Sequence, residues 1–229
     1  MRSKLFVFRH AQSTDNARNF FSGWSDPDLT ENGLLQAQQT AEQLKDEWID
    51  YAFTSHLKRA LKTLEIVLRY HPGVPMFIDD RLIERCYGLL QGTNKLQLAK
   101  EKPEWTKKVR RDYETVPPEG ESIRMVTYRT ISFFEELKAW LRIHPGNVAI
   151  SCHGNSMRPI RRMYEHLSIQ QMLQIENPQD RALEYALSIH EVRVEVPNPI
   201  KFKPVWRGVR VPDDVCMATD PRNPLIAYY

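Results

Sequence analysis

Lys4-Leu5-Phe6-Val7-Phe8-Arg9-His10-Ala11 is the segment from which the architecture can first be inferred. Leu5 to Phe8 form a short, unbroken apolar run, which is typical of a strand buried on both faces of a sheet. Arg9 and His10 follow where this strand ends, and α/β folds bind their ligands at such strand ends. Arginine can hold phosphate oxygens with two donors at once, and a neutral imidazole can act as a nucleophile. The segment therefore predicts phosphate chemistry, provided that distant segments supply the partners.

The size and composition of the chain indicate one α/β domain. Its 229 residues, 41% of them hydrophobic, can enclose one substantial core. We expect a single catalytic domain over residues 1–196 and a proline-rich C-terminal arm over 197–229. Cys86, Cys152 and Cys216 follow no metal-ligand or disulfide pattern, which favours a reducing, cytoplasmic location. No apolar run approaches the roughly 20 residues of a membrane helix, so no membrane partner is expected.

Positive charge is concentrated in one part of the sequence. A net charge of +3 over the whole chain is too small to suggest that the protein binds nucleic acid. Between Arg85 and Arg111, however, eight Lys or Arg residues stand against two acidic ones, which gives a local net charge of +6. Such a segment can be a solvated helix surface or a cationic cover for an anionic substrate, and composition alone leaves both open.

Hydrophobic periodicity predicts alternating strands and helices. Thr30 is a predicted N-cap for an amphipathic helix whose apolar stripe runs from Leu34 to Trp48. Ser55 is the predicted N-cap of a second helix. The other predicted elements are strands at 51–54, 76–78 and 148–150, helices at 123–141 and from Met157, a polar loop at 11–27 and an irregular segment at 79–100. Trp48 and Trp140 are expected in the core and Trp24 as a loop anchor. This order predicts an α/β fold with a mostly parallel central sheet and helices on both faces.

Chemically distinctive residues recur where the predicted strands end. Arg9 and His10 follow the first strand, Arg59 comes one turn after Ser55, and His153 follows the strand at 148–150. In a parallel sheet these positions lie at one edge. Two histidines and two arginines can therefore converge there, with Glu84 from the irregular segment as a proton carrier, an inventory that suits phosphoryl transfer without a metal. Neighbouring cations should lower the pKa of His10 and keep its imidazole neutral.

The residues match, in order, the motifs of a known family from about Lys4 to about Ser168. The matching blocks are Arg9-His10, Ser13, Asn16, Phe21-Ser22-Gly23-Trp24, Leu29-Thr30-x-x-Gly33, Thr54-Ser55-x-x-x-Arg59-Ala60, Glu84-Arg85-x-Tyr87-Gly88, Gly92-x-Asn94-Lys95, Arg110-Arg111 and His153-Gly154-Asn155-Ser156. With these blocks the sequence resembles the 2,3-bisphosphoglycerate-dependent phosphoglycerate mutases of the histidine phosphatase superfamily. The Arg-His and His-Gly pairs are general to the superfamily, whereas the Phe-x-Gly-Trp, Glu-Arg-x-Tyr-Gly and Gly-x-Asn-Lys blocks are particular to the mutases.

The resemblance implies a function and a role for each matching residue. The expected reaction interconverts 3-phosphoglycerate and 2-phosphoglycerate through a phosphohistidine primed by 2,3-bisphosphoglycerate, without a metal. It implies that His10 takes the phosphoryl group, that Glu84 is the general acid and base, and that Arg9, Arg59 and His153 hold the phosphoryl group. The residues implied to line the pocket or grip the substrate are Ser13, Asn16, Ser22, Gly23, Tyr87, Lys95, Arg110, Arg111, Gly154 and Asn155. Members of the family are often homodimers or homotetramers.

The sequence departs from the family pattern in three places. Ala11 stands where the family has glycine, a change that costs about 1 kcal/mol if the residue needs a positive φ and almost nothing otherwise. The stretch from Pro117 to Ser122 is shorter than in most of these mutases, and a smaller cover would admit water and raise hydrolysis. Asn177-Pro178-Gln179-Asp180 replaces the usual Pro-Thr-Gly loop.

Three alternative functions fit parts of the sequence. Cys152 to Arg158 satisfies the C-x5-R pattern of cysteine-dependent phosphatases, but that reading leaves His10 and Glu84 without a role. A histidine phosphatase that hydrolyses a small phosphorylated acid or bisphosphoglycerate would use His10 in the same way, but it has less need of Arg110 and Arg111. The third alternative is a module that binds phosphorylated ligands without turnover.

Overall fold

The computed structural model describes residues 3–187, and these form a five-stranded sheet in the order β3-β2-β4-β1-β5. The strands are β1 (Ser3–Arg9), β2 (Tyr51–Thr54), β3 (Met76–Ile78), β4 (Val148–Cys152) and β5 (Leu183–Leu187). β1 to β4 run parallel, and β5 pairs antiparallel with β1 at the edge. The mostly parallel sheet of the predicted fold class is confirmed.

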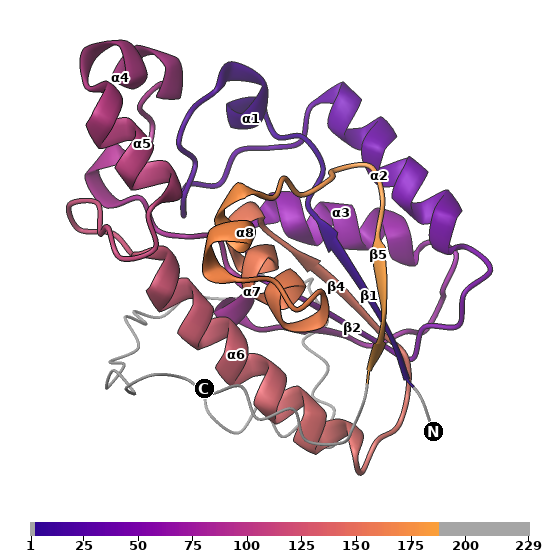
Figure 1. The fold of residues 1–229 in the computed structure, drawn as a ribbon. Helices are drawn as coiled ribbons and strands as arrows, with labels where there is room; N and C mark the ends of the chain where they lie inside the picture. Colours follow the sequence, from indigo (N-terminus) through magenta and orange to yellow (C-terminus); the bar gives the residue numbers. More distant parts are fainter. Residues whose placement is uncertain (1–2, 188–229) are drawn as a thin grey trace.

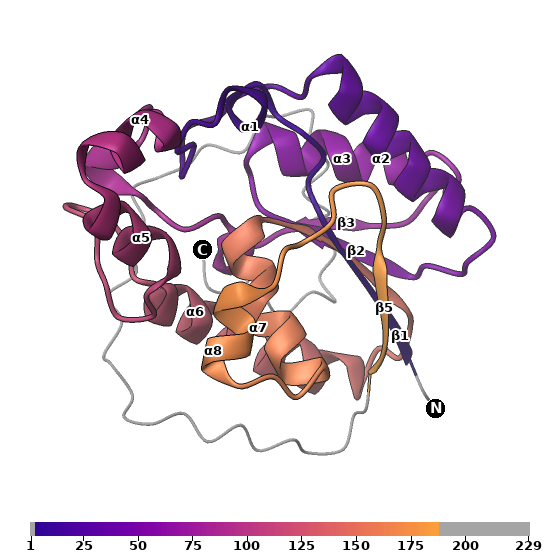
Figure 2. The same ribbon diagram turned by 45° about the horizontal axis from the view of Figure 1, so that its top comes forward.

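Two pairs of helices cover opposite faces of this sheet (Figures 1 and 2). α2 (Glu31–Leu44) and α3 (Lys58–Leu68) pack together on one face, and α6 (Ile123–Leu141) and α7 (Gly154–Tyr164) on the other. The shorter helices are α1 (Thr14–Arg18), α4 (Lys95–Glu101), α5 (Pro103–Arg111), α8 (Ile169–Gln174) and the 3-10 turns η1 (Asp80–Leu82) and η2 (Gly88–Leu90). α1, α4 and α5 lie beyond the ends of the strands in Figure 1, outside the sheet and the two helix layers that cover it.

Alternation along β1 explains why both faces of the sheet are apolar. Leu5 and Val7 pack in the cluster formed with α6 and α7, whereas Phe6 and Phe8 pack in the cluster formed with α2 and α3. Side chains of a strand point to opposite faces in turn, so one unbroken apolar run serves both layers. Each of these fully buried side chains contributes about 2 kcal/mol by leaving water.

Most of the predicted elements are confirmed, including the strands, the Thr30 N-cap and the long helix now seen as α6. Trp140 is buried in the core with 3% of its surface exposed, and Trp24 is anchored by a hydrogen bond from its indole to the Glu84 carbonyl. No described helix is long and apolar enough to cross a membrane. Residues 188–196 of the predicted domain and the predicted arm at 197–229 lie outside the described residues.

Several predictions of local structure are wrong. α2 ends at Leu44, so the apolar stripe does not reach Trp48, which is 74% exposed and donates its indole hydrogen to Asp50. Ser55 does not cap α3, whose N-cap is Leu57 without a side-chain bond.

Other errors concern irregular segments. The predicted loop at 11–27 contains α1, and the irregular segment at 79–100 contains η1, η2 and most of α4. α7 begins at Gly154 rather than near Met157. β5 was not predicted, although Leu183, Tyr185 and Leu187 alternate with Glu184 and Ala186 as in a half-buried strand.

Candidate active site

The central strands end together and bring the two histidines side by side. Arg9 at the end of β1 is in register with Cys152 at the end of β4, and the His10 amide donates to the Cys152 carbonyl at 2.8 Å. His153 directly follows Cys152, the last residue of β4, and therefore lies beside His10. The centroids of the two imidazole rings are 5.0 Å apart. The convergence predicted from the strand ends is therefore observed for residues 143 positions apart in sequence.

Hydrogen bonds fix the tautomer of His10 and orient its ring. His10 Nδ1 lies 2.8 Å from the Ala11 carbonyl oxygen, which can only accept, so Nδ1 carries the hydrogen of the neutral ring and Nε2 holds a lone pair. Arg59 Nε donates to Nε2 at 3.3 Å. Burial, followed by the charges of Arg59 and Arg9, holds the pKa of His10 well below its usual value. The sequence predicts the effect of the charges but not that burial is the larger cause.

Ala11 fits the site without strain. Its φ is not positive, so alanine has no conformational penalty relative to the family's glycine. The Ala11 side chain is buried, and its amide donates to the Thr63 hydroxyl at 3.1 Å. The substitution beside His10 is thus compatible with the same backbone course.

Two buried nitrogens near His10 have no hydrogen-bond partner among the described residues. They are Arg9 Nε and His153 Nδ1. The other ring nitrogen of His153, Nε2, lies 2.7 Å from the Ser55 hydroxyl oxygen, which also accepts from the Leu57 amide at 3.4 Å. Because buried polar atoms are nearly always bonded, Arg9 Nε, which belongs to a cavity-lining residue, suits a ligand that brings its own acceptor.

The Glu84 carboxylate has two oxygens in different surroundings. Oε1 accepts three hydrogen bonds, from the Arg85 amide at 2.7 Å and from the Asn155 amide and side chain at 3.1 and 2.9 Å. No hydrogen bond reaches Oε2 from the described residues; this oxygen faces Gly154, where α7 begins. A proton on Oε1 would oppose three N–H donors, so Oε2 is the oxygen that can carry one.

A second group of cations lines the same cavity from α4 and α5. Lys95, Arg110 and Arg111 belong to this group, which we call the distal cations. Burial, with Arg9 and Arg110 as further causes, lowers the pKa of Lys95 to about 8. The other lysines of the basic segment are exposed and form a solvated helix surface. The distal cations, in contrast, line the cavity, where they can face an anionic substrate.

The cavity gathers most of the predicted residues. Those that line it are Arg9, His10, Asn16, Ser22, Gly23, Arg59, Glu84, Tyr87, Lys95, Arg110, Arg111, Gly154 and Asn155. Ser13 is not among them, because its hydroxyl caps α1 by accepting from the Asn16 amide. His153 is fully buried beside His10 rather than on the cavity wall.

Three lining residues, Arg158, Glu176 and Asn177, were not predicted as site residues. Arg158 lies one turn after Gly154 on α7, so helical periodicity could have revealed it. Glu176 and Asn177 follow α8 in a loop, where no periodic signal exists.

The loop after α8 is tied to the catalytic strand ends, and we call residues 176–179 the strap. Asn177 donates to the Gly154 carbonyl at 2.7 Å, and Gln179 donates to the His10 carbonyl at 3.2 Å. The Glu176 carboxylate forms an ion pair with Arg111. The strap thus places an acidic group against one of the distal cations.

Cys152 does not line the cavity. Its side chain is fully buried on β4, and its thiol donates to the Phe8 carbonyl at 3.6 Å. Burial raises the pKa of the Cys152 thiol. A buried neutral thiol is a poor nucleophile, which argues against the C-x5-R alternative. Within residues 3–187, no group of three or more His, Cys, Asp or Glu side chains is arranged to hold a metal ion.

The mostly parallel sheet, with an Arg-His pair where β1 ends and a second histidine after β4, defines the class of protein. The chain belongs to the histidine phosphatase superfamily (branch 1), whose family model matches residues 5–196, and it is an enzyme of that superfamily.

Curated relatives narrow the similarity within this superfamily. One is a 2,3-bisphosphoglycerate-dependent phosphoglycerate mutase of Chlamydia felis, 33% identical over 214 residues that cover 81% of this chain and 94% of the relative. Another, 2,3-bisphosphoglycerate-dependent phosphoglycerate mutase 2 of Gloeobacter violaceus, is 40% identical over 176 residues, or 75% of this chain and 80% of the relative.

Solved structures confirm the fold. A mycobacterial glucosyl-3-phosphoglycerate phosphatase superposes with a TM-score of 0.72 at 24% sequence identity, covering 80% of this chain and 90% of that one.

Proposed function

We propose that the protein interconverts 3-phosphoglycerate and 2-phosphoglycerate through a phosphohistidine at His10, primed by 2,3-bisphosphoglycerate. The observation that carries this proposal is one cavity with cations at two ends: Arg9 and Arg59 beside the neutral His10 at one, and the distal cations from α4 and α5 at the other. A simple monoester needs only the first end. Relatives that bear the mutase name at 33% and 40% identity support the same activity.

The environment of His10 suits attack on phosphorus. Its Nε2 lone pair would form the new N–P bond while the bond from phosphorus to the substrate oxygen breaks. Arg59 Nε already donates to that lone pair, so the arriving phosphoryl oxygens would take over this donor as the N–P bond forms. The unpartnered Arg9 Nε supplies a further donor for the phosphoryl group.

Proton transfer would pass through Glu84 Oε2. When the substrate oxygen leaves phosphorus it needs a proton, and Oε2 would supply it; in the reverse half-reaction Oε2 would take the proton back from the attacking hydroxyl. The three donors to Oε1 hold the carboxyl group in one orientation during both steps. Asn155, which provides two of them, would therefore orient the proton carrier rather than contact phosphorus.

The residues present also fit the priming molecule. When bound, 2,3-bisphosphoglycerate supplies the phosphoryl group that loads His10. Lys95, Arg110 and Arg111 would hold the carboxylate and the phosphate that is not transferred, while Asn16, Ser22, Gly23 and Tyr87 line the space between the two ends. The loaded His10 would then pass its phosphoryl group to 3-phosphoglycerate, and the bisphosphate so formed would reorient within the cavity and return its other phosphoryl group to His10, leaving 2-phosphoglycerate.

The conversion of 3-phosphoglycerate to 2-phosphoglycerate, followed with and without added 2,3-bisphosphoglycerate, tests the proposal. Released inorganic phosphate is measured in parallel. We expect isomerisation that depends on the bisphosphate and exceeds phosphate release. Phosphate release without isomerisation would overturn the proposal.

A second function, hydrolysis of a small phosphorylated acid by the same His10, is favoured by one observation. Glu176 neutralises part of the distal charge at Arg111 and so weakens the end of the cavity that a mutase needs most. The short stretch from Pro117 to Ser122 is consistent with easier access of water. The same assay separates the two functions, because only hydrolysis releases phosphate in proportion to substrate consumed.

A further inference from the structure

Glu84 lies on a segment that has no regular secondary structure to hold it. Residues 83–87 follow η1 without forming a strand or helix, yet Ile83, Glu84 and Arg85 are buried. Buried main-chain carbonyls need donors, and here neighbouring strands cannot provide them. The position of the Glu84 backbone, from which its side chain extends, therefore depends on the side chains that bind this segment.

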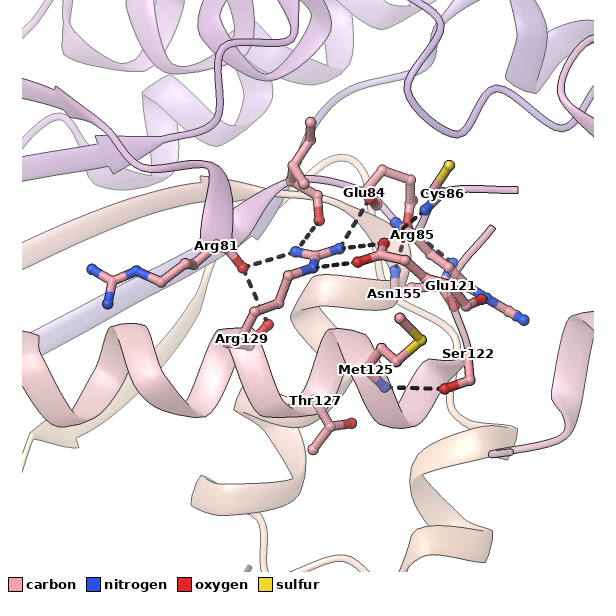
Figure 3. A network of polar contacts seen from close by, with 12 residues as sticks. Arg81, Glu84, Arg85, Cys86, Glu121, Ser122, Met125, Thr127, Arg129 and Asn155 are labelled. Atoms are coloured by element: carbon pink, nitrogen blue, oxygen red, sulfur yellow. Dashed lines mark hydrogen bonds and ion pairs between the residues drawn. The ribbon is translucent and has the colours of Figure 1, made fainter. Parts of the chain in front are cut away.

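An arginine of α6 supplies most of the hydrogen bonds to these carbonyls. Arg129 is 5% exposed, and its Nη1 donates to the Arg81 and Ile83 carbonyls at 2.8 Å each. Its Nη2 donates to the carbonyl of Glu84 itself at 3.0 Å. Figure 3 shows this guanidinium reaching from α6 to the segment that carries Glu84. The indole of Trp24 also donates to the Glu84 carbonyl, at 2.7 Å.

Glu121, just before α6, completes the arrangement. Its Oε1 and Oε2 accept from Arg129 Nε and Nη2, each at 3.1 Å, and Oε2 also accepts from the Cys86 amide at 2.9 Å. The two side chains thus bind the backbone before and after Glu84 while pairing with each other (Figure 3). Neither residue lines the cavity, so neither can touch a substrate there.

We infer that Arg129 and Glu121 are positioning residues, which set where Glu84 Oε2 lies and thereby control the proton-transfer step. This inference rests on the proposed role of Glu84 as proton carrier. The planar arginine fork is required because it serves three carbonyls and a carboxylate in fixed directions, which the compact ammonium group of lysine cannot do. A displacement of about 1 Å at a reacting group can cost about 100-fold in rate, so loss of this fork should be visible in the chemistry.

A double-mutant cycle between Arg129→Lys and Glu84→Gln tests the inference. Lysine keeps the buried positive charge beside Glu121, so the variant is chosen to retain the fold, which circular dichroism and thermal unfolding check. The reaction measured is single-turnover phosphorylation of His10, with 2,3-bisphosphoglycerate and with two aryl phosphates. Phenyl phosphate has a leaving group that needs a proton, whereas 2,4-dinitrophenyl phosphate has one that leaves as the phenolate.

The leaving group distinguishes positioning from a general loss of structure. Glu84→Gln should slow phosphorylation by phenyl phosphate by about 100-fold or more and affect the dinitrophenyl ester far less. Arg129→Lys should also slow phosphorylation by phenyl phosphate more than by the dinitrophenyl ester, with a loss of about tenfold on phenyl phosphate. In a protein that already carries Glu84→Gln, adding Arg129→Lys should slow the same reaction by about twofold at most. Glu121→Gln, which weakens the same pairing from the other side, should repeat the pattern.

Thr127→Val is the matched control on α6. Thr127 is also buried, and its hydroxyl donates to the Ile123 carbonyl within the helix at 2.9 Å. Its effect should be equal for both aryl phosphates and unchanged by Glu84→Gln. If Arg129→Lys behaves like this control, slowing both esters equally and multiplying with Glu84→Gln, the positioning inference is overturned. An unimpaired Glu84→Gln would overturn the Glu84 assignment and the inference together, whereas failure of the mutase proposal alone would leave the aryl phosphate results intact.

Discussion

Arg59 Nε lies 3.3 Å from His10 Nε2, the atom that we propose as the nucleophile, and its other two nitrogens donate at 2.8 Å to the carbonyls of Ser25 and Gly23. The guanidinium is therefore held by the loop after α1 while it faces the imidazole. Arg59 thus helps to keep the lone pair of His10 free of a proton, and in the proposed reaction the same cation would bind the phosphoryl oxygens. Because burial and the nearby arginines lower the pKa of His10 in the folded protein, they should also make the free energy of unfolding depend on pH.

The free energy of unfolding should fall when the pH decreases below about 6.5, the ordinary histidine pKa. Burial and nearby arginines hold the pKa of His10 and of His153 well below that value in the folded protein. The unfolded chain therefore binds protons that the folded protein does not, and each histidine contributes a loss of up to about 1.4 kcal/mol per pH unit. Urea unfolding of His153→Gln should give a shallower pH dependence than the unsubstituted protein. Identical slopes would contradict the prediction.

Binding of 3-phosphoglycerate should weaken above about pH 8. The pKa of Lys95 is lowered to about 8, so its ammonium group loses its proton there and one distal charge disappears. Because the anion binds the charged form, the Kd should rise by up to about tenfold per pH unit above the pKa. Calorimetric titration of Lys95→Arg, whose side chain stays charged, should remove this dependence. A Kd that rises equally in the variant would show that another group is responsible.

Glu176→Gln should increase affinity for ligands that carry a distal anion. The Glu176 carboxylate pairs with Arg111, and a bound ligand would have to displace it. Because Glu176 is largely exposed, we expect only about a two- to fivefold decrease in Kd for 3-phosphoglycerate and none for glycerol 3-phosphate, which lacks the carboxylate. Glu114→Gln is the matched control, since Glu114 is an exposed partner of Arg124 at 3.1 Å. Equal tightening for both ligands would contradict a role at the distal end.

Cys152→Ser should leave the rate of phosphoryl transfer within about twofold of the unsubstituted enzyme, because a buried thiol cannot supply the nucleophilic thiolate. The serine hydroxyl can donate to the Phe8 carbonyl as the thiol does. His10→Ala, in contrast, should abolish the reaction. Steady-state rates of the two variants compare them directly, and a loss of about 100-fold in Cys152→Ser would restore the C-x5-R alternative.

The sheet and the convergence of His10, Arg59 and His153 could be predicted because they follow from local patterns. Unbroken apolar runs identify parallel strands, and parallel strands end at one edge. Those two rules place Arg9 and His153 at the same edge of the sheet, whereas the pairing of Arg9 with Cys152 comes from the structure.

Residues whose partners are distant could not be predicted in the same way. Ser55 has the sequence context of a helix cap, but its hydroxyl is bonded to His153, 98 positions away. In the sequence, Arg129 and Glu121 are ordinary charged residues in and before a predicted helix. Only the course of the irregular segment brings Arg129 to the Glu84 carbonyl and Glu121 to the Cys86 amide. The prediction for Trp48 was wrong because a local pattern was extended too far: the apolar periodicity continues to Trp48, but α2 ends at Leu44.

The most direct test of the proposed reaction is the fate of the phosphoryl group on His10. The enzyme is loaded with 2,3-bisphosphoglycerate, the phosphohistidine is located by mass spectrometry, and 3-phosphoglycerate is then added while phosphorylated products and inorganic phosphate are measured. We predict that His10 carries the group and passes it to phosphoglycerate faster than to water, with 2-phosphoglycerate accumulating. Loss of the group to water alone, or its appearance on a residue other than His10, would contradict the account.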